Sequence, residues 1–176
     1  MKPLVLTSFP IPEFIKSGLA DLAVHFFHRF IWGPLPSLDE LKAYLGPRGL
    51  DQHSGTHWSA FASNWRESSQ EEHRGLSLAE FCQQYETVEL WFDTHPYAQL
   101  QMAWLLDHFS SCPETVARLR LRLLDLDLVG LHPGQFEKLR QPITDVAEHE
   151  LETASALWQA YRQPTPEACS ICSSRI

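Results

Sequence analysis

The chain has 176 residues, of which 44% are hydrophobic and 20% charged, and its formal net charge at pH 7 is −8. This composition is typical of a folded protein rather than a disordered one, and the length predicts a single domain over residues 1–176. The negative charge disfavours non-specific nucleic-acid binding, which needs a positive field. No apolar run is long enough to span a membrane and the start of the chain does not resemble a signal peptide, so we expect a cytoplasmic protein.

The four cysteines are Cys82, Cys112, Cys169 and Cys172. In a chain without an export signal they are expected to be reduced thiols. Cys169 and Cys172 have the spacing of a redox motif or of half a zinc site, but no second pair is present to complete a zinc site. We therefore predict no metal centre.

Strands and helices are expected to alternate in the first half of the chain. The apolar runs 4–6 and 22–31 predict strands. Ser37, followed three residues later by Glu40, has the capping-box spacing that begins a helix, and Gly46 is expected to end it.

Residues 46–76 are polar and interrupted by glycines, which indicates an insertion in the sheet. Within it, apolar residues recur at the spacing of an amphipathic helix: Trp58, Phe61, Ala62 and Trp65. This helix would cover a face of the sheet, or alternatively form a lid over a site.

The central stretch predicts a strand, a polar turn and a helix in succession. Residues 88–92 are a short apolar run typical of a strand buried on both faces, and 93–96 is a polar turn. From Tyr97 to Phe109 apolar residues return at helical spacing. Ligands of α/β proteins bind where strands pass into helices, so we expect any site to border Asp93.

The last third of the chain predicts one more strand and a helical segment. Residues 118–123 alternate arginine and leucine, which indicates a strand with a wet face or an edge position. Its three arginines could bind phosphates, but solvated side chains covering a sheet edge are the favoured interpretation. Thr144 is expected to cap a long helix that ends before Pro164.

These elements predict an α/β fold with a mainly parallel, Rossmann-like sheet of about four or five strands flanked by helices. We place the α/β core at residues 1–128, with the insertion at 46–76, and a helical C-terminal segment at 131–168. The strand ends should gather the candidate ligand-binding residues at one edge of the sheet: Ser8, Trp32, Asp93, His95, Gln99 and Asp127.

Chemistry at this edge has several alternatives. Asp93 and His95 are the candidate catalytic residues, as an acid–base pair or as groups that hold Mg²⁺ on a substrate phosphate, with Ser8 as a candidate nucleophile. The glycine-rich loops and nucleophile elbows of common enzyme families are absent from the sequence. No cofactor is indicated.

Two segments of the chain resemble a bacterial family known as domain of unknown function 1835. Residues 91–101, WFDTHPYAQLQ, are similar to its segment W-F-E-H-D-x-[FY]-D-Q-L-Q. Residues 140–144 (RQPIT) and 156–164 (ALWQAYRQP) resemble its R-x-P-V-T and A-x-W-x-A-[FY]-R-x-P, and residues 33–36 (GPLP) resemble its G-P-[VL]-P. The resemblance thus extends over most of the chain, and the family brings no established reaction with it.

The chain departs from that family at its polar positions. The family's N-G-D-S after the first strand is here Thr7-Ser8-Phe9-Pro10, its E-H-D is Asp93-Thr94-His95, and the acid of D-Q-L-Q is Ala98. If those acids support an activity in the family, this chain has lost or shifted it. We therefore favour a non-catalytic binding or interaction protein. The alternative is an enzyme or binder acting on a nucleotide or another phosphorylated metabolite, and a homodimer is left open.

Overall fold

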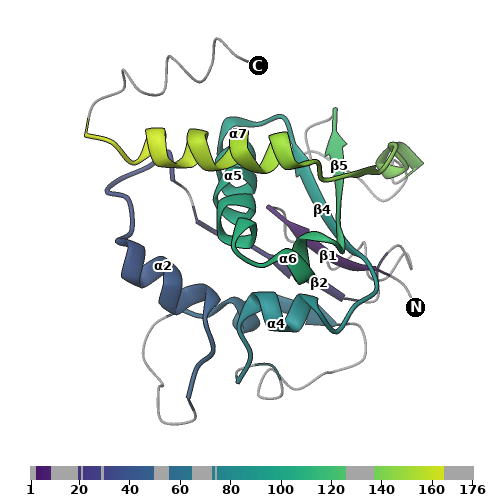
Figure 1. Cartoon of the computed structure of the whole chain (residues 1–176), viewed down its shortest axis with the longest axis horizontal. Helices are drawn as coiled ribbons and strands as arrows, with labels where there is room; N and C mark the ends of the chain where they lie inside the picture. Colours follow the sequence, from purple (N-terminus) through teal and green to yellow (C-terminus); the bar gives the residue numbers. More distant parts are fainter. Residues whose placement is uncertain are drawn as a thin grey trace.

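The computed structural model describes residues 3–8, 20, 22–28, 30–49, 56–64, 73, 75–125 and 137–164. Its strands are β1 (Leu4–Thr7), β2 (Leu22–His25), β3 (Ala62–Asn64), β4 (Val88–Asp93), β5 (Leu119–Leu124) and β6 (Thr144–Asp145). Its helices are α2 (Leu38–Leu45), the 3₁₀-helix η1 (Trp58–Phe61), α4 (Leu78–Cys82), α5 (Pro96–Ser110), α6 (Pro113–Val116) and α7 (Glu148–Tyr161). In Figure 1, α5 stands in front of the sheet and α7 crosses it.

The strands form one sheet in the order β3-β2-β1-β4-β5-β6. The inner strands β2, β1, β4 and β5 are parallel, and β3 and β6 pair antiparallel with the outermost of them. From β1 the chain moves to β2 on one side, and it later crosses to β4 on the other side. The predicted α/β fold with a mainly parallel sheet and a C-terminal helix is thereby confirmed. The strand order reverses between β1 and β4, which is where ligands bind in open parallel sheets.

The register aligns the ends of the parallel strands at one edge of the sheet. Thr7 is opposite His25 on one side and Trp91 on the other, and Asp93 is opposite Leu124. We call this edge, formed by the C-terminal ends of β1, β2, β4 and β5, the carboxyl edge. Ser8 and Asp93 therefore both lie at the carboxyl edge, on neighbouring strands.

Alternate residues of the inner strands pack on opposite faces of the sheet. Leu6, Leu90 and Phe92 belong to the main core beneath the helices, where each is fully buried. Glu89 and Trp91 alternate with them and are also buried, so β4 is covered on both faces as its composition predicts.

Local sequence signals set the ends of the helices. The Ser37 hydroxyl accepts from the Glu40 N–H at 3.2 Å, and the Glu40 carboxylate accepts from the Ser37 N–H at 2.7 Å, which confirms the predicted capping box. Gly46 ends α2, where a β-carbon would stand 2.9 Å from the Lys42 carbonyl oxygen. A larger residue at position 46 would therefore disturb the end of α2.

The second strand is much shorter than predicted, because its aromatic extension packs under the helices instead of continuing the sheet. β2 ends at His25, and the Phe26 N–H makes a last hydrogen bond to the Thr7 carbonyl at 3.0 Å. The rings of Phe26 and Phe30 then pack on Trp104 of α5, at centroid distances of 5.9 and 5.3 Å.

Two helix predictions were wrong. The apolar spacing from residue 58 is not one amphipathic helix: it divides into η1 and the edge strand β3, and Trp65 lies outside the described residues. Thr144 does not cap the last helix, because it belongs to β6, and α7 begins at Glu148 with Ala147 as its N-cap residue. Helical spacing over a single turn is equally compatible with a 3₁₀ turn followed by a strand.

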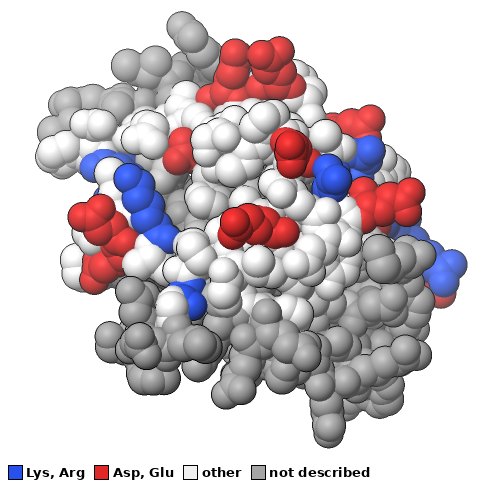
Figure 2. Space-filling model, turned by 60° about the horizontal axis from the view of Figure 1, so that its bottom comes forward, with Lys and Arg blue, Asp and Glu red and all other residues white. Residues whose placement is uncertain are grey.

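The surface of the described residues carries mixed charge. On the face shown in Figure 2, the basic side chains lie in small groups next to acidic ones. Within the same part of the chain, no helix combines the length and the apolar character needed to cross a bilayer.

Candidate functional site

Three of the predicted site residues meet in the turn between β4 and α5. The Asp93 carboxylate accepts from the His95 N–H at 2.9 Å. The main-chain carbonyl oxygen of Asp93 accepts from the Gln99 side-chain amide at 2.5 Å. Asp93 is only 1% exposed. A buried aspartate that bonds to the backbone two residues ahead is a common way to fix such a turn. With Ser8, these residues form what we call the switch-point site.

Ser8 contributes from the end of β1. It is 5% exposed, and its hydroxyl has no hydrogen-bond partner among the described residues. Its carbonyl oxygen lies 3.1 Å from Nε2 of His25, which therefore carries the proton at that nitrogen. Burial lowers the pKa of His25 to about 4, and the bond to Ser8 offsets only part of that shift. The imidazole is neutral at physiological pH.

The N-terminus of α5 opens at the same turn. This helix has 15 residues, its N-cap residue His95 makes no side-chain capping hydrogen bond, and Pro96 at its first position has no N–H to donate. The positive end of the helix macrodipole therefore lies next to Asp93. The exposed His95 ring instead packs on the ring of Tyr97, at a centroid distance of 4.5 Å.

The structure does not add the other two predicted ligand-binding residues to this group. Trp32 lies in the connection between β2 and α2 with 73% of its surface exposed. Asp127 falls outside the described residues.

A small aromatic cavity of about 150 Å³ lies beside the end of β2. We call it the β2-end cavity, and its lining residues are Phe27, His28, Tyr44, Thr56 and Phe61. The Tyr44 hydroxyl and Nδ1 of His28 are both buried, and the part of the chain that the structure describes offers neither a partner. Burial raises the pKa of Tyr44 and lowers that of His28, so both side chains are neutral at physiological pH.

Hydrogen bonds connect this cavity to the switch-point site. The Gln101 amide of α5 donates to the His28 carbonyl at 2.6 Å, and His25 reaches the Ser8 carbonyl. The first of these bonds ties α5 to the segment after β2, and the second ties β2 to the end of β1.

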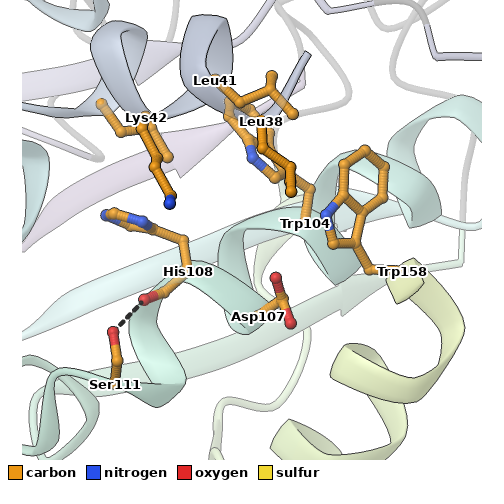
Figure 3. A pocket seen from close by; sticks show the side chains of 9 residues that line it. Leu38, Leu41, Lys42, Trp104, Asp107, His108, Ser111 and Trp158 are labelled. Carbon is orange, nitrogen blue, oxygen red and sulfur yellow. Dashed lines mark hydrogen bonds between the residues drawn. The ribbon is translucent and has the colours of Figure 1, made fainter. Parts of the chain in front are cut away.

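A second cavity, of about 200 Å³, lies between the helices (Figure 3). We call it the helix-layer cavity. Leu38, Leu41 and Lys42 of α2 form one wall, Trp104, Asp107 and His108 of α5 form another, and Trp158 of α7 closes one end.

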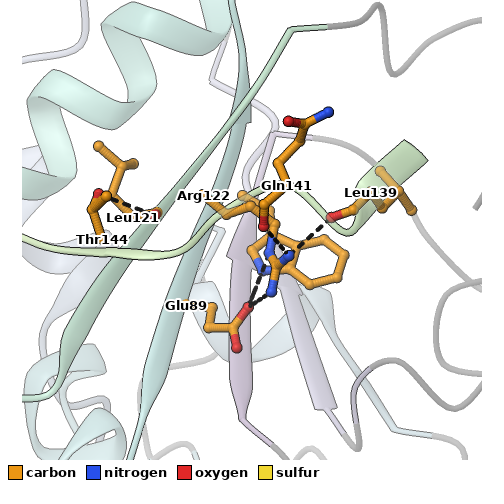
Figure 4. A network of polar contacts seen from close by, with 7 residues as sticks. Glu89, Leu121, Arg122, Leu139, Gln141 and Thr144 are labelled. Carbon is orange, nitrogen blue, oxygen red and sulfur yellow. Dashed lines mark hydrogen bonds and ion pairs between the residues drawn. The ribbon is translucent and has the colours of Figure 1, made fainter. Parts of the chain in front are cut away.

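Arg122 of β5 is not a solvated side chain, which corrects the sequence interpretation for this arginine. Arg122 donates to the buried Glu89 carboxylate at 3.0 Å and to the carbonyl oxygens of Leu139 and Gln141 at 3.0 and 2.6 Å (Figure 4). Its guanidinium also lies over the Trp91 ring, 4.8 Å from the centroid. β5 is not an edge strand either, because β6 pairs with its outer side.

Metal ligation finds no support in the described residues. They contain no group of three or more histidine, cysteine or acidic side chains that could hold an ion. His57 is buried, and its Nε2 bonds to the Gly46 carbonyl at 2.7 Å, which fixes the loop before η1. Cys169 and Cys172 fall outside the described residues.

Sequence reasoning missed three side chains near the carboxyl edge: His25, Tyr44 and Gln101. Each stands on an otherwise apolar face of its strand or helix, where a polar residue is easily mistaken for a core residue without a binding role. The aromatic run at 26–28, which ends the second strand early, was the available signal.

Comparisons with known proteins do not decide among these sites. No family model, curated protein or solved structure matches the chain.

Proposed function

We propose that this chain is a non-catalytic binding protein for a nucleotide or a related phosphorylated metabolite, held at the carboxyl edge of the sheet between β1 and β4. The observation that supports the proposal most strongly is that three features lie at the ends of the neighbouring strands β2, β1 and β4. They are the buried Ser8 hydroxyl, which has no partner among the described residues, the N-terminus of α5 and the aromatic β2-end cavity. The resemblance to the domain of unknown function 1835 family is compatible with it and remains a prediction.

The phosphate is assigned to the N-terminus of α5. The positive end of the helix macrodipole favours an anion there. Asp93 opposes an anion by its charge, but its carboxylate already accepts the His95 N–H. We therefore expect modest affinity and sensitivity to the charge at position 93.

The β2-end cavity favours a nucleotide over a metabolite without a ring. Its walls combine aromatic rings with two polar atoms, on Tyr44 and His28, that have no partner within the described part of the chain. A heteroaromatic base would stack on the rings and offer donors and acceptors to the polar atoms.

The absence of turnover is proposed because Asp93 and His95 are not arranged as an acid–base pair. The Asp93 carboxylate bonds to the backbone of His95, while the imidazole packs on Tyr97. The second candidate function is an enzyme acting on the same ligand. It is kept because Asp93 and His95 lie in the same turn, close enough to act on one substrate.

The test is a thermal-shift titration with nucleoside mono-, di- and triphosphates and inorganic phosphate, with and without Mg²⁺. A ligand present at 100 times its Kd should stabilise the fold by roughly 2.7 kcal/mol. Ser8→Ala and Tyr44→Phe should each reduce the shift, and Asp93→Asn should increase it by removing the opposing charge. His149→Gln, an exposed histidine on α7, is the matched control.

Two outcomes would change the conclusion. Absence of any shift across the panel, or shifts that Ser8→Ala and Tyr44→Phe leave intact, would refute the binding site. If chromatography shows that the chain consumes the nucleotide, and His95→Ala abolishes this consumption, the chain is an enzyme instead.

A further inference from the structure

The helix-layer cavity has a charge pattern that the carboxyl edge does not explain. Lys42 of α2 and Asp107 of α5 both line it, yet no ion pair joins them among the described residues. Lys42 is exposed, and among the described residues the Asp107 carboxylate receives only long hydrogen bonds of 3.3 and 3.4 Å, both from Gln159. Two opposite charges therefore face one hollow from separate helices.

The remaining lining is apolar, apart from one neutral imidazole and the Ser111 hydroxyl, which donates to the His108 carbonyl oxygen at 3.1 Å. Trp104 and Trp158 are almost fully buried behind the cavity, and Leu38 is half exposed at its mouth. In Figure 3 the Lys42 ammonium and the His108 ring point to one side of the cavity, while Asp107 and Trp158 lie toward the other. Burial lowers the pKa of His108, against the smaller opposing effect of Asp107, and its Nε2 finds no partner in the described part of the chain.

We propose that this cavity binds a free α-amino acid with an apolar side chain. The ligand carboxylate would pair with Lys42 and the ligand ammonium with Asp107, and the side chain would lie against the indoles of Trp104 and Trp158. A purely anionic ligand is disfavoured by Asp107, and a purely cationic one by Lys42. The volume of about 200 Å³ is below the range of drug-sized sites, which fits a ligand of this size.

The proposal is independent of the nucleotide site. The helix-layer cavity is built by α2, α5 and α7, and none of its lining residues belongs to the switch-point site or to the β2-end cavity. Either site can fail while the other stands.

Isothermal titration and tryptophan fluorescence of the full chain test the proposal with leucine and phenylalanine. Both should bind and change the emission, because two indoles line the cavity. Phenylpropionate, which lacks the ammonium, and phenethylamine, which lacks the carboxylate, should each bind roughly tenfold or more weakly, the value of one hydrogen bond to a charged group.

Two variants should each remove one of these ligand preferences. Lys42→Met should remove the advantage of phenylalanine over phenethylamine, and Asp107→Asn should remove its advantage over phenylpropionate. Lys138→Met and Glu114→Gln alter exposed charges elsewhere and should change nothing. Circular dichroism of each variant checks that it is folded.

The proposal is overturned if neither amino acid gives heat or a fluorescence change at millimolar concentration. It is also overturned if binding occurs but Lys42→Met and Asp107→Asn leave the order of the three ligands unchanged. Equal binding of phenylpropionate and phenylalanine by the unmodified chain would assign the cavity to simple carboxylates and refute the role of Asp107.

Discussion

Arg122 shows how one side chain can fasten a distant segment to the sheet. Its guanidinium pairs with Glu89 on β4 and also holds two carbonyl oxygens of residues 139–141. Arg122→Met would leave the Glu89 carboxylate, 6% exposed, without its counter-ion. We expect a loss of about 3–5 kcal/mol in the free energy of unfolding, measured by urea denaturation.

Arg120 supplies the matched control, because its partner Asp145 has 82% of its side chain exposed. Arg120→Met should cost roughly 1 kcal/mol or less. Equal losses for the two variants would show that the Arg122 network is no more stabilising than a surface pair.

His25 should make the fold sensitive to mild acid. Its pKa falls from 6.5 to about 4 on folding, chiefly through burial, so the unfolded chain binds the proton more readily. Its contribution to stability is complete above pH 6.5 and is lost as the pH falls toward 4. His25→Gln should therefore reduce the difference in urea midpoint between pH 7 and pH 5, and NMR titration of the imidazole should give the low pKa directly.

At the scale of elements, local signals were readable wherever they involved neighbouring residues. The capping box at Ser37, the strand from Val88 and the helix after Pro96 are all confirmed, and a second capping box at Ser77 begins α4. The prediction that Thr144 caps a helix was wrong because the backbone of Thr144 pairs with β5, 23 residues away, and no local sequence pattern displays such a pairing.

The caps give a direct test of that distinction. Ser77→Ala removes the side-chain acceptor for the Glu80 N–H at 3.2 Å and should lower the free energy of unfolding by about 1 kcal/mol. Thr144→Ala removes no helix cap and should cost clearly less. If Thr144→Ala lowers the free energy of unfolding in urea as much as Ser77→Ala does, Thr144 acts as a helix cap after all.

At the scale of the whole molecule, the sequence located the carboxyl edge but not what surrounds it. Alternation of strands and helices was enough to place Ser8 beside the turn at Asp93. The two cavities could not be foreseen, because each is lined by segments that lie far apart in the sequence.

Trp158 tests whether the C-terminal helix is part of one cooperative unit. It is 1% exposed, its ring lies 4.7 Å from that of Phe30, and Arg162 covers it at 5.5 Å. Trp158→Ala should lower stability by about 3–5 kcal/mol while unfolding remains a single transition. An early separate transition, seen by circular dichroism before the fluorescence changes, would instead make α7 an independent appendage.

The two shortest strands, β3 and β6, flank the parallel strands on both sides. They offer an incoming polypeptide only three and two residues of backbone to pair with. Long exposed edges are the usual starting point for runaway strand addition between copies. Self-association through a shared sheet is therefore disfavoured here, and if two copies do associate, we expect contact between side chains rather than between main chains.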